Sequence, residues 1–106
     1  MKEGKQSNAL SLLEDSLGEA ISLGMMLRAH RTRMGMTQSE LAEKLKTTKS
    51  YISDVEKGRK HVSLEKAVQF ARGLGEAEAV FAEIAVKDQL GRMGLQYSVH
   101  LTALAG

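Results

Sequence analysis

The chain lacks several residue types, and each absence narrows what it can be. Its 106 residues include no cysteine, no proline and no tryptophan, and aromatic residues make up only 4%. Without cysteine there is no disulfide and no thiolate metal site. No apolar run approaches the roughly 20 residues of a membrane span, and the first ten residues lack the hydrophobic core of a signal peptide. We therefore expect a cytoplasmic protein without a membrane partner.

The composition of the chain is rich in residues that favour helices. Hydrophobic residues make up 42% of the chain and charged residues 26%, which is typical of a folded domain rather than a disordered segment. With only two tyrosines and two phenylalanines, the core must come from aliphatic residues and methionine. The length suits one compact domain with short extensions. We predict an all-α fold.

Apolar residues recur at helical spacing in five segments between residues 22 and 91. A capping box, from Thr37 to Glu40, starts the second segment. The link to the third segment is so short that the two helices must cross steeply, as in a helix-turn-helix. Thr47 or Thr48 is expected to cap the third segment, and glycines are expected to end the segments. The predicted ranges are 22–34 before Gly35, 37–45, 47 or 48 to 57 before Gly58, 63–73 at Gly73 and 76–91 at Gly91. The predicted inner face of the fourth segment, which Ser63 caps, is Leu64, Ala67, Val68 and Ala71.

The two ends of the chain have patterns of their own. Residues 1–21 are predicted to be an extension that is partly helical or disordered, outside a folded domain of residues 22–91. Residues 92–106 form a tail. Within it, apolar and polar residues alternate strictly over residues 95–101, a pattern typical of a β-strand. With no other strand expected, its partner would be the same strand of a second molecule. The predicted dimerisation face is Leu95, Tyr97, Val99 and Leu101; the alternative is a frayed tail.

Positive charge is concentrated in the middle of the chain. The net charge is only +2, but residues 28–61 carry nine lysines and arginines against four acidic residues. The rest of the chain carries six basic and nine acidic residues. Such a local excess of positive charge favours binding to a polyanion.

The segment from Thr37 to Gly58 resembles the helix-turn-helix of the phage-repressor-like, or XRE-type, family of bacterial regulators. The resemblance rests on TQSELAEKL, the two threonines before the third helix, YISDVEKG, and SLEKAVQFARGLG in the helix that follows. It covers about residues 22–85. It implies a five-helix, phage-repressor-like helix-turn-helix bundle that binds double-stranded DNA, usually as a homodimer. The protein would then be bacterial or phage-derived and associated with the nucleoid.

The third segment is expected to enter the DNA. Ile52 and Val55 are its only aliphatic anchors, and the major groove, about 12 Å wide, admits an α-helix whose other side chains point outward. The resemblance puts the base-reading positions on Lys49, Ser50 and Asp54, with Ser53 nearby. The alternative for these residues is a solvated helix face.

Phosphate contacts are expected at the start of the second segment and around the third segment. The candidates are Gln38 at the start of the second segment and, near the third, Thr48, Tyr51, Lys57, Arg59 and Lys60. The alternative for Tyr51 is a packed ring that exposes only its hydroxyl.

Two further positions follow from the resemblance. Arg31 and Glu56 match an internal ion pair that ties the first helix to the third; the alternative is two independent surface charges. Lys46 occupies a turn position that is often glycine because it favours positive φ. A lysine there adopts the left-handed region at a cost near 1 kcal/mol.

No pattern for other chemistry is present. The three histidines lack metal-ligand spacing, no glycine-rich phosphate loop follows a strand, and no nucleophile has a positioned base nearby. We therefore expect no enzyme activity, no cofactor and no metal. Two functions stay open: a repressor of transcription, and an antitoxin that binds a toxin protein and represses its own operon.

Overall fold

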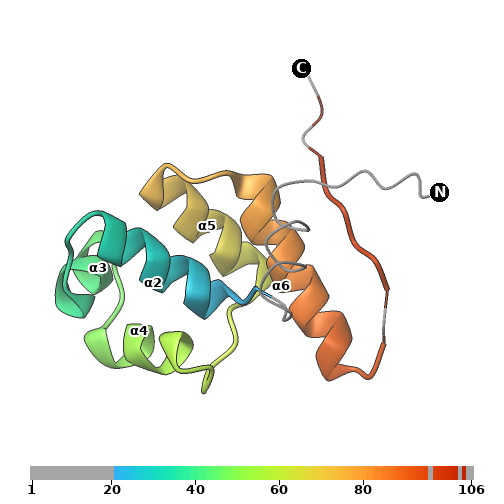
Figure 1. Ribbon diagram of the computed structural model, residues 1–106, viewed down its shortest axis with the longest axis horizontal. Helices are drawn as coiled ribbons and strands as arrows, with labels where there is room; N and C mark the ends of the chain where they lie inside the picture. The colour runs from blue at the N-terminus through green and yellow to red at the C-terminus, as the bar shows by residue number, and fades with distance from the viewer. Residues whose placement is uncertain (1–20, 96, 103, 105–106) are drawn as a thin grey trace.

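The computed structural model describes residues 21–95, 97–102 and 104, and this part of the chain contains five helices (Figure 1). The predicted N-terminal extension lies almost wholly outside the described residues. The helices are α2 (Leu23–Arg33), α3 (Gln38–Lys44), α4 (Lys49–Glu56), α5 (Leu64–Leu74) and α6 (Glu78–Arg92). The all-α prediction is therefore confirmed for the part that is described.

Short polar side chains start four of the five helices. The hydroxyl of each N-cap residue accepts a hydrogen bond from the amide three residues later, at 3.0–3.1 Å. These N-caps are Ser22, Thr37, Thr48 and Ser63. Each such cap contributes about 1 kcal/mol to stability. The local sequence therefore sets where α2 to α5 begin.

Two of the predicted helix ends are wrong. Gly35 and Gly58 follow their helices with positive φ, as expected, but Gly73 and Gly91 lie inside α5 and α6. The left-handed residues after these helices are Gly75 and Gly94, with φ of 70° and 78°. A glycine inside a helix costs only about 1 kcal/mol. The continuation of α5 past Gly73 offsets this cost because it buries Leu74.

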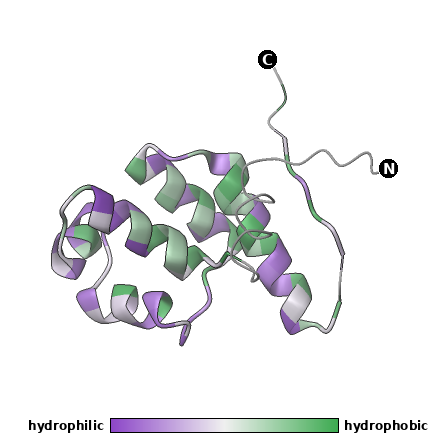
Figure 2. Cartoon of the chain, viewed as in Figure 1, coloured by the Kyte–Doolittle hydropathy of each residue, from purple (hydrophilic) through white to green (hydrophobic). Residues whose placement is uncertain are grey.

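The core is aliphatic, with two phenylalanines. Its largest fully buried side chains are Phe81, Leu27, Leu41 and Ile52. On α5 the buried face is Ala67, Phe70, Ala71 and Leu74. The prediction that Leu64 faces inward is wrong, since 43% of this residue is exposed. Each helix carries both hydrophobic and hydrophilic residues (Figure 2), and no described helix is long and apolar enough to cross a bilayer.

The consecutive helices α3 and α4 pack together, as do α5 and α6. Of the helices that are distant in sequence, α2 packs against both α4 and α6. The contact of α2 with α4 is made through backbone: a Cβ added to Gly24 would lie 2.2 Å from the carbonyl oxygen of Val55. The absence of a side chain at Gly24 therefore lets the two helices touch. This contact positions α4 relative to the rest of the protein.

The predicted C-terminal strand is not formed among residues 95, 97–102 and 104. A strand needs a neighbouring strand for its backbone groups, and the described elements of this chain are helices. The amide of Leu101 instead donates a 2.9 Å hydrogen bond to Glu83 of α6, a residue only 3% exposed. Nδ1 of His100 lies 4.0 Å from the same carboxylate. The tail thus rests on α6, on the side of the molecule away from α3 and α4 (Figure 1).

Candidate nucleic-acid interface

α3 and α4 form a helix-turn-helix whose turn contains a lysine in an unusual conformation. Lys46 has a φ of 59° and is the only residue other than glycine with positive φ in the described chain. The amides of Lys46 and Thr47 are satisfied by the carbonyls of Glu43 and Ala42, at 3.1 and 2.9 Å. The prediction of a left-handed lysine here is confirmed. Its side chain is exposed, so the turn carries a positive charge.

α4 is attached to the protein by a thin apolar strip, as its sequence indicates. Ile52 and Val55 are 0% and 3% exposed. Of the base-reading candidates, Lys49 and Ser50 are exposed, whereas Ser53 and Asp54 are half-buried. The N-terminal turn of α4 is therefore its most open polar surface.

Asp54 organises the loop that follows α4. Its carbonyl accepts hydrogen bonds from the amides of Arg59 and Lys60, at 2.7 and 3.3 Å. Its carboxylate lies 4.0 Å from a guanidinium nitrogen of Arg59. The side chains of Lys57, Arg59 and Lys60 are all exposed. The structure thus gathers these three phosphate candidates at the C-terminal end of α4.

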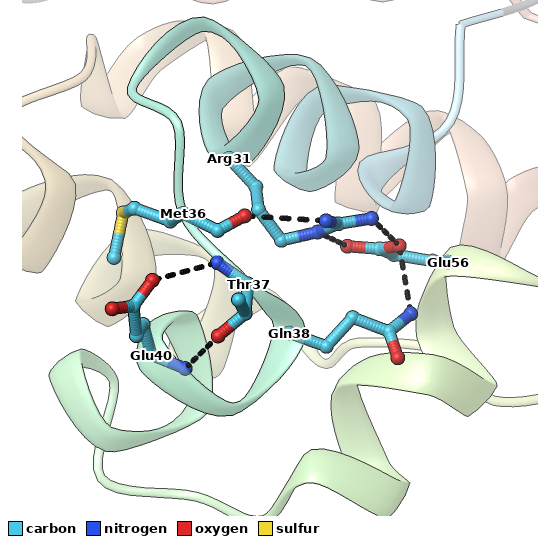
Figure 3. Close-up of polar contacts among 6 residues, drawn as sticks. All are labelled: Arg31, Met36, Thr37, Gln38, Glu40 and Glu56. Carbon is cyan, nitrogen blue, oxygen red and sulfur yellow. Dashed lines mark hydrogen bonds and ion pairs between the residues drawn. The ribbon is translucent and has the colours of Figure 1, made fainter.

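Arg31 and Glu56 form the predicted ion pair (Figure 3). The contact is bidentate: Nε and Nη2 of Arg31 donate to the two carboxylate oxygens of Glu56, each at 2.9 Å. Nη1 also donates to the carbonyl of Met36, at 3.3 Å. Because the Glu56 side chain is only 3% exposed, this pair connects α2 to the end of α4 within the protein. The pair therefore holds the two helices together inside the protein.

Gln38 takes part in the same network, which its sequence position did not reveal. Its amide nitrogen donates to Oε1 of Glu56 at 3.1 Å (Figure 3). Gln38 is half-buried. In this structure its amide therefore fixes the start of α3 to the end of α4, and a phosphate contact stays a prediction.

Two carboxyl groups have lowered pKa values. Burial by itself would raise the pKa of Glu56, but hydrogen bonds from Arg31 and Gln38 and the charges of Arg31 and Arg28 outweigh it. The pKa of Glu76 is lowered mainly by hydrogen bonds from His30 and Arg33. Both groups therefore favour their charged form in the folded protein.

This arrangement predicts that the free energy of unfolding falls in acid. A carboxyl whose pKa is lowered by folding stabilises the protein above its unfolded pKa, near 4.5, and the stabilisation is lost as the pH falls through the folded value. Urea unfolding at several pH values between about 7 and 3 would measure this loss. The double variant Glu56→Gln, Glu76→Gln should show a shallower dependence below about pH 4.5. Equal dependence in both proteins would contradict the prediction.

Tyr51 packs its ring against Phe70 and lies close to two lysines. The ring meets Phe70 edge-on, with centroids 6.3 Å apart, and burial raises the pKa of Tyr51. Nζ of Lys60 lies 5.9 Å from the ring centroid and Nζ of Lys66 lies 4.8 Å from it, within the range of cation–π attraction. Sequence reasoning missed Lys66 because it lies on α5. Only the packing of α5 beside α4 brings it to Tyr51.

His30 is a second residue that the sequence did not single out. It is 3% exposed, and its Nδ1 lies 2.7 Å from Oε2 of Glu76, which also accepts from Arg33 at 2.9 Å. Its other ring nitrogen has no hydrogen-bond partner among the described residues. No group of three or more acidic or histidine side chains in the described ranges could hold a metal ion. These contacts instead join α2 to the segment between α5 and α6.

Comparisons with known proteins agree with this geometry. A family model described as helix-turn-helix matches residues 27–81. Over 50 residues the chain is 46% identical to an uncharacterized HTH-type transcriptional regulator of Methanothermobacter thermautotrophicus, an alignment that covers 47% of this chain and 72% of that protein.

Three solved structures are also similar. A hypothetical transcription factor from Neisseria has a TM-score of 0.52 at 28% identity, covering 67% of this chain and 79% of that one. The clp gene regulator ClgR from C. glutamicum has a TM-score of 0.51 at 38% identity, covering 60% and 82%. A mutant of the restriction-modification controller protein C.Esp1396I has a TM-score of 0.50 at 27% identity, covering 63% and 85%.

Proposed function

Because the chain belongs to the XRE-type family of helix-turn-helix transcriptional regulators, we propose that it is a repressor that binds a two-fold symmetric DNA operator as a homodimer. The observation that carries this proposal is the construction of α4. Two buried residues, Ile52 and Val55, hold it to the protein, and its N-terminal turn exposes Lys49 and Ser50. Membership of this family also means that the chain is a DNA-binding regulator rather than an enzyme.

Base recognition is assigned to the outward side chains of α4. Lys49 donates to O6 or N7 of guanine, Asp54 accepts from N4 of cytosine, and Ser50 serves several bases. Ser53 lies beside them. Phosphate contacts from the exposed side chains at both ends of α4 supply affinity and register, and they come from Thr48, Lys57, Arg59 and Lys60.

A symmetric dimer sets the form of the operator. Two copies of α4 would lie about 34 Å apart, one turn of DNA, so that the site is a palindrome. Bound there, the protein would repress by blocking polymerase. Selection of bound duplexes from a random DNA pool, followed by sequencing, tests the proposal. Enrichment of a palindrome with half-sites about one turn apart is expected, and binding without any enriched sequence would overturn it.

Replacing Lys49 with alanine is expected to change which base is preferred at one position of each half-site. Without its contact to guanine, discrimination at that position falls by about 1–3 kcal/mol. The matched control is Lys57→Ala, at the other end of the same helix, which should weaken binding to all sequences by the same factor. Binding of both variants to a set of single-base operator changes would measure the difference. A uniform loss for Lys49→Ala would assign it to phosphate instead.

Dimerisation is assigned to the apolar residues of the tail. Tyr97 and Leu101 are 66% and 40% exposed, and Leu95 and Val99 are half-buried. The double variant Tyr97→Ser, Leu101→Ser should lower the mass in solution, measured by light scattering, from that of a dimer toward that of a monomer. It keeps the backbone bond to Glu83, so the tail stays in place. Deletion of residues 95–106 should have the same effect. An unchanged mass in both variants would exclude the tail as the dimerisation surface.

The second candidate function is an antitoxin subunit. The observation that favours it is the same exposed apolar tail, to which Met93 and Leu104 add residues 63% and 94% exposed. Such a surface suits a protein partner. A neighbouring gene whose product stops growth, and whose effect this chain relieves, would support the antitoxin. Deleting the tail should then abolish this chain's relief of the growth arrest, but it should leave the surface of α4 unchanged.

A further inference from the structure

A basic groove lies between the α3–α4 turn and α5. Its volume is about 360 Å³, and we call it the lysine groove. Lys44 and Lys46 line it from the side of the turn, and Lys66 and Phe70 line it from α5. No acidic residue is among the described residues that line it. The groove therefore brings together positive charges without a carboxylate to neutralise them.

The three lysines are available to an anion. All three are exposed, and within the described chain none of them forms an ion pair, whereas Arg31, Arg33, Arg59, Arg72 and Arg92 each do. Thr47 and Gln69 add a hydroxyl and an amide to the lining. Hydroxyl, amide and ammonium groups are the donors that usually bind phosphate oxygens. The lining therefore suits a phosphate-bearing polyanion.

We propose that the lysine groove binds phosphates of the DNA strand that flanks each half-site. This assignment rests on the proposed function. The groove is continuous with the reading helix in two ways. Thr47 directly precedes Thr48, the N-cap of α4, along the chain, and Nζ of Lys66 lies over the ring of Tyr51, a residue of α4. A strand that passes the N-terminal end of α4 therefore also passes the groove. This continuity favours DNA over an acidic protein as the occupant.

The triple variant Lys44→Gln, Lys46→Gln, Lys66→Gln tests the assignment in the full chain. Its affinity for the selected operator and for an unrelated duplex should fall by the same factor, about tenfold or more near physiological salt. The slope of log affinity against log salt should become shallower by about 1 for each phosphate that the variant no longer binds. Fluorescence anisotropy titrations with labelled duplexes at several salt concentrations would measure both quantities.

Two further variants make the result specific. Arg72→Gln removes the same charge from α5 but outside the groove, where the arginine pairs with Glu78, and should keep wild-type affinity and slope. The double variant Lys44→Gln, Lys66→Gln leaves the left-handed turn at Lys46 unchanged, and it should still lower the affinity and make the salt slope shallower. If the triple variant keeps wild-type affinity and salt slope, the assignment of the groove to DNA is overturned while the proposed function stands, and an acidic protein is left as the occupant. A wild-type chain that binds no duplex would overturn the proposed function as well.

Discussion

Replacing Arg31 with alanine is expected to lower the free energy of unfolding by about 3–5 kcal/mol. The substitution leaves the carboxylate of Glu56, whose side chain is 3% exposed, with Gln38 as its remaining hydrogen-bond partner in the described chain. A neutral amide cannot replace the charge of a bidentate guanidinium. The effect is large because removal of one partner leaves the other charge buried. Urea unfolding followed by circular dichroism would measure it.

Two controls separate charge from geometry at this site. Arg31→Lys keeps the charge but not the paired hydrogen bonds, so it should fall between the wild type and the alanine variant. The double variant Arg31→Met, Glu56→Leu removes both charges and should be more stable than Arg31→Ala. If Arg31→Ala loses less than about 1 kcal/mol, the pair behaves as two independent surface charges, and the structural role assigned to it is wrong.

Replacing Gly24 with alanine is expected to lower the free energy of unfolding by about 3 kcal/mol. The new methyl group would lie 2.2 Å from the carbonyl oxygen of Val55 and 3.0 Å from Cα of Glu56. Both obstacles are backbone atoms, so α2 and α4 must move apart. Because α4 carries the proposed base-reading residues, DNA affinity should fall together with stability. Thermal unfolding and operator binding of the same preparation would show both losses.

Gly91 provides a matched control for that substitution. It also lies inside a helix, and a Cβ added there meets nothing within 4 Å. Gly91→Ala should therefore stabilise the protein by about 0.5–1 kcal/mol through helix propensity alone. If both alanine variants behave alike, the close approach at Gly24 does not control the packing of α2 on α4.

Features that depend on neighbouring residues could be predicted from the sequence. The capping box and the hydroxyl caps are each decided within about four residues along the chain. The left-handed Lys46 could be predicted from the family pattern of the turn. The ion pair of Arg31 with Glu56 spans 25 residues, and it could be predicted only because a family pattern supplied the pairing. The alternation in the tail predicted a strand, which the described residues of the single chain do not form, because a strand depends on a neighbouring strand that this part of the chain does not provide.

The sequence by itself therefore determined the all-α class, the starts of α2 to α5, and an α4 with few apolar residues and an exposed basic turn. Tertiary structure decided which groups meet across α2, α4 and α5. It placed His30 beside Glu76, 46 residues away, Lys66 over Tyr51, and Gly24 against the backbone of Val55. The physical reason is that hydrogen bonds and caps within a helix follow from local spacing, whereas side chains on different helices meet only through close packing of the whole core.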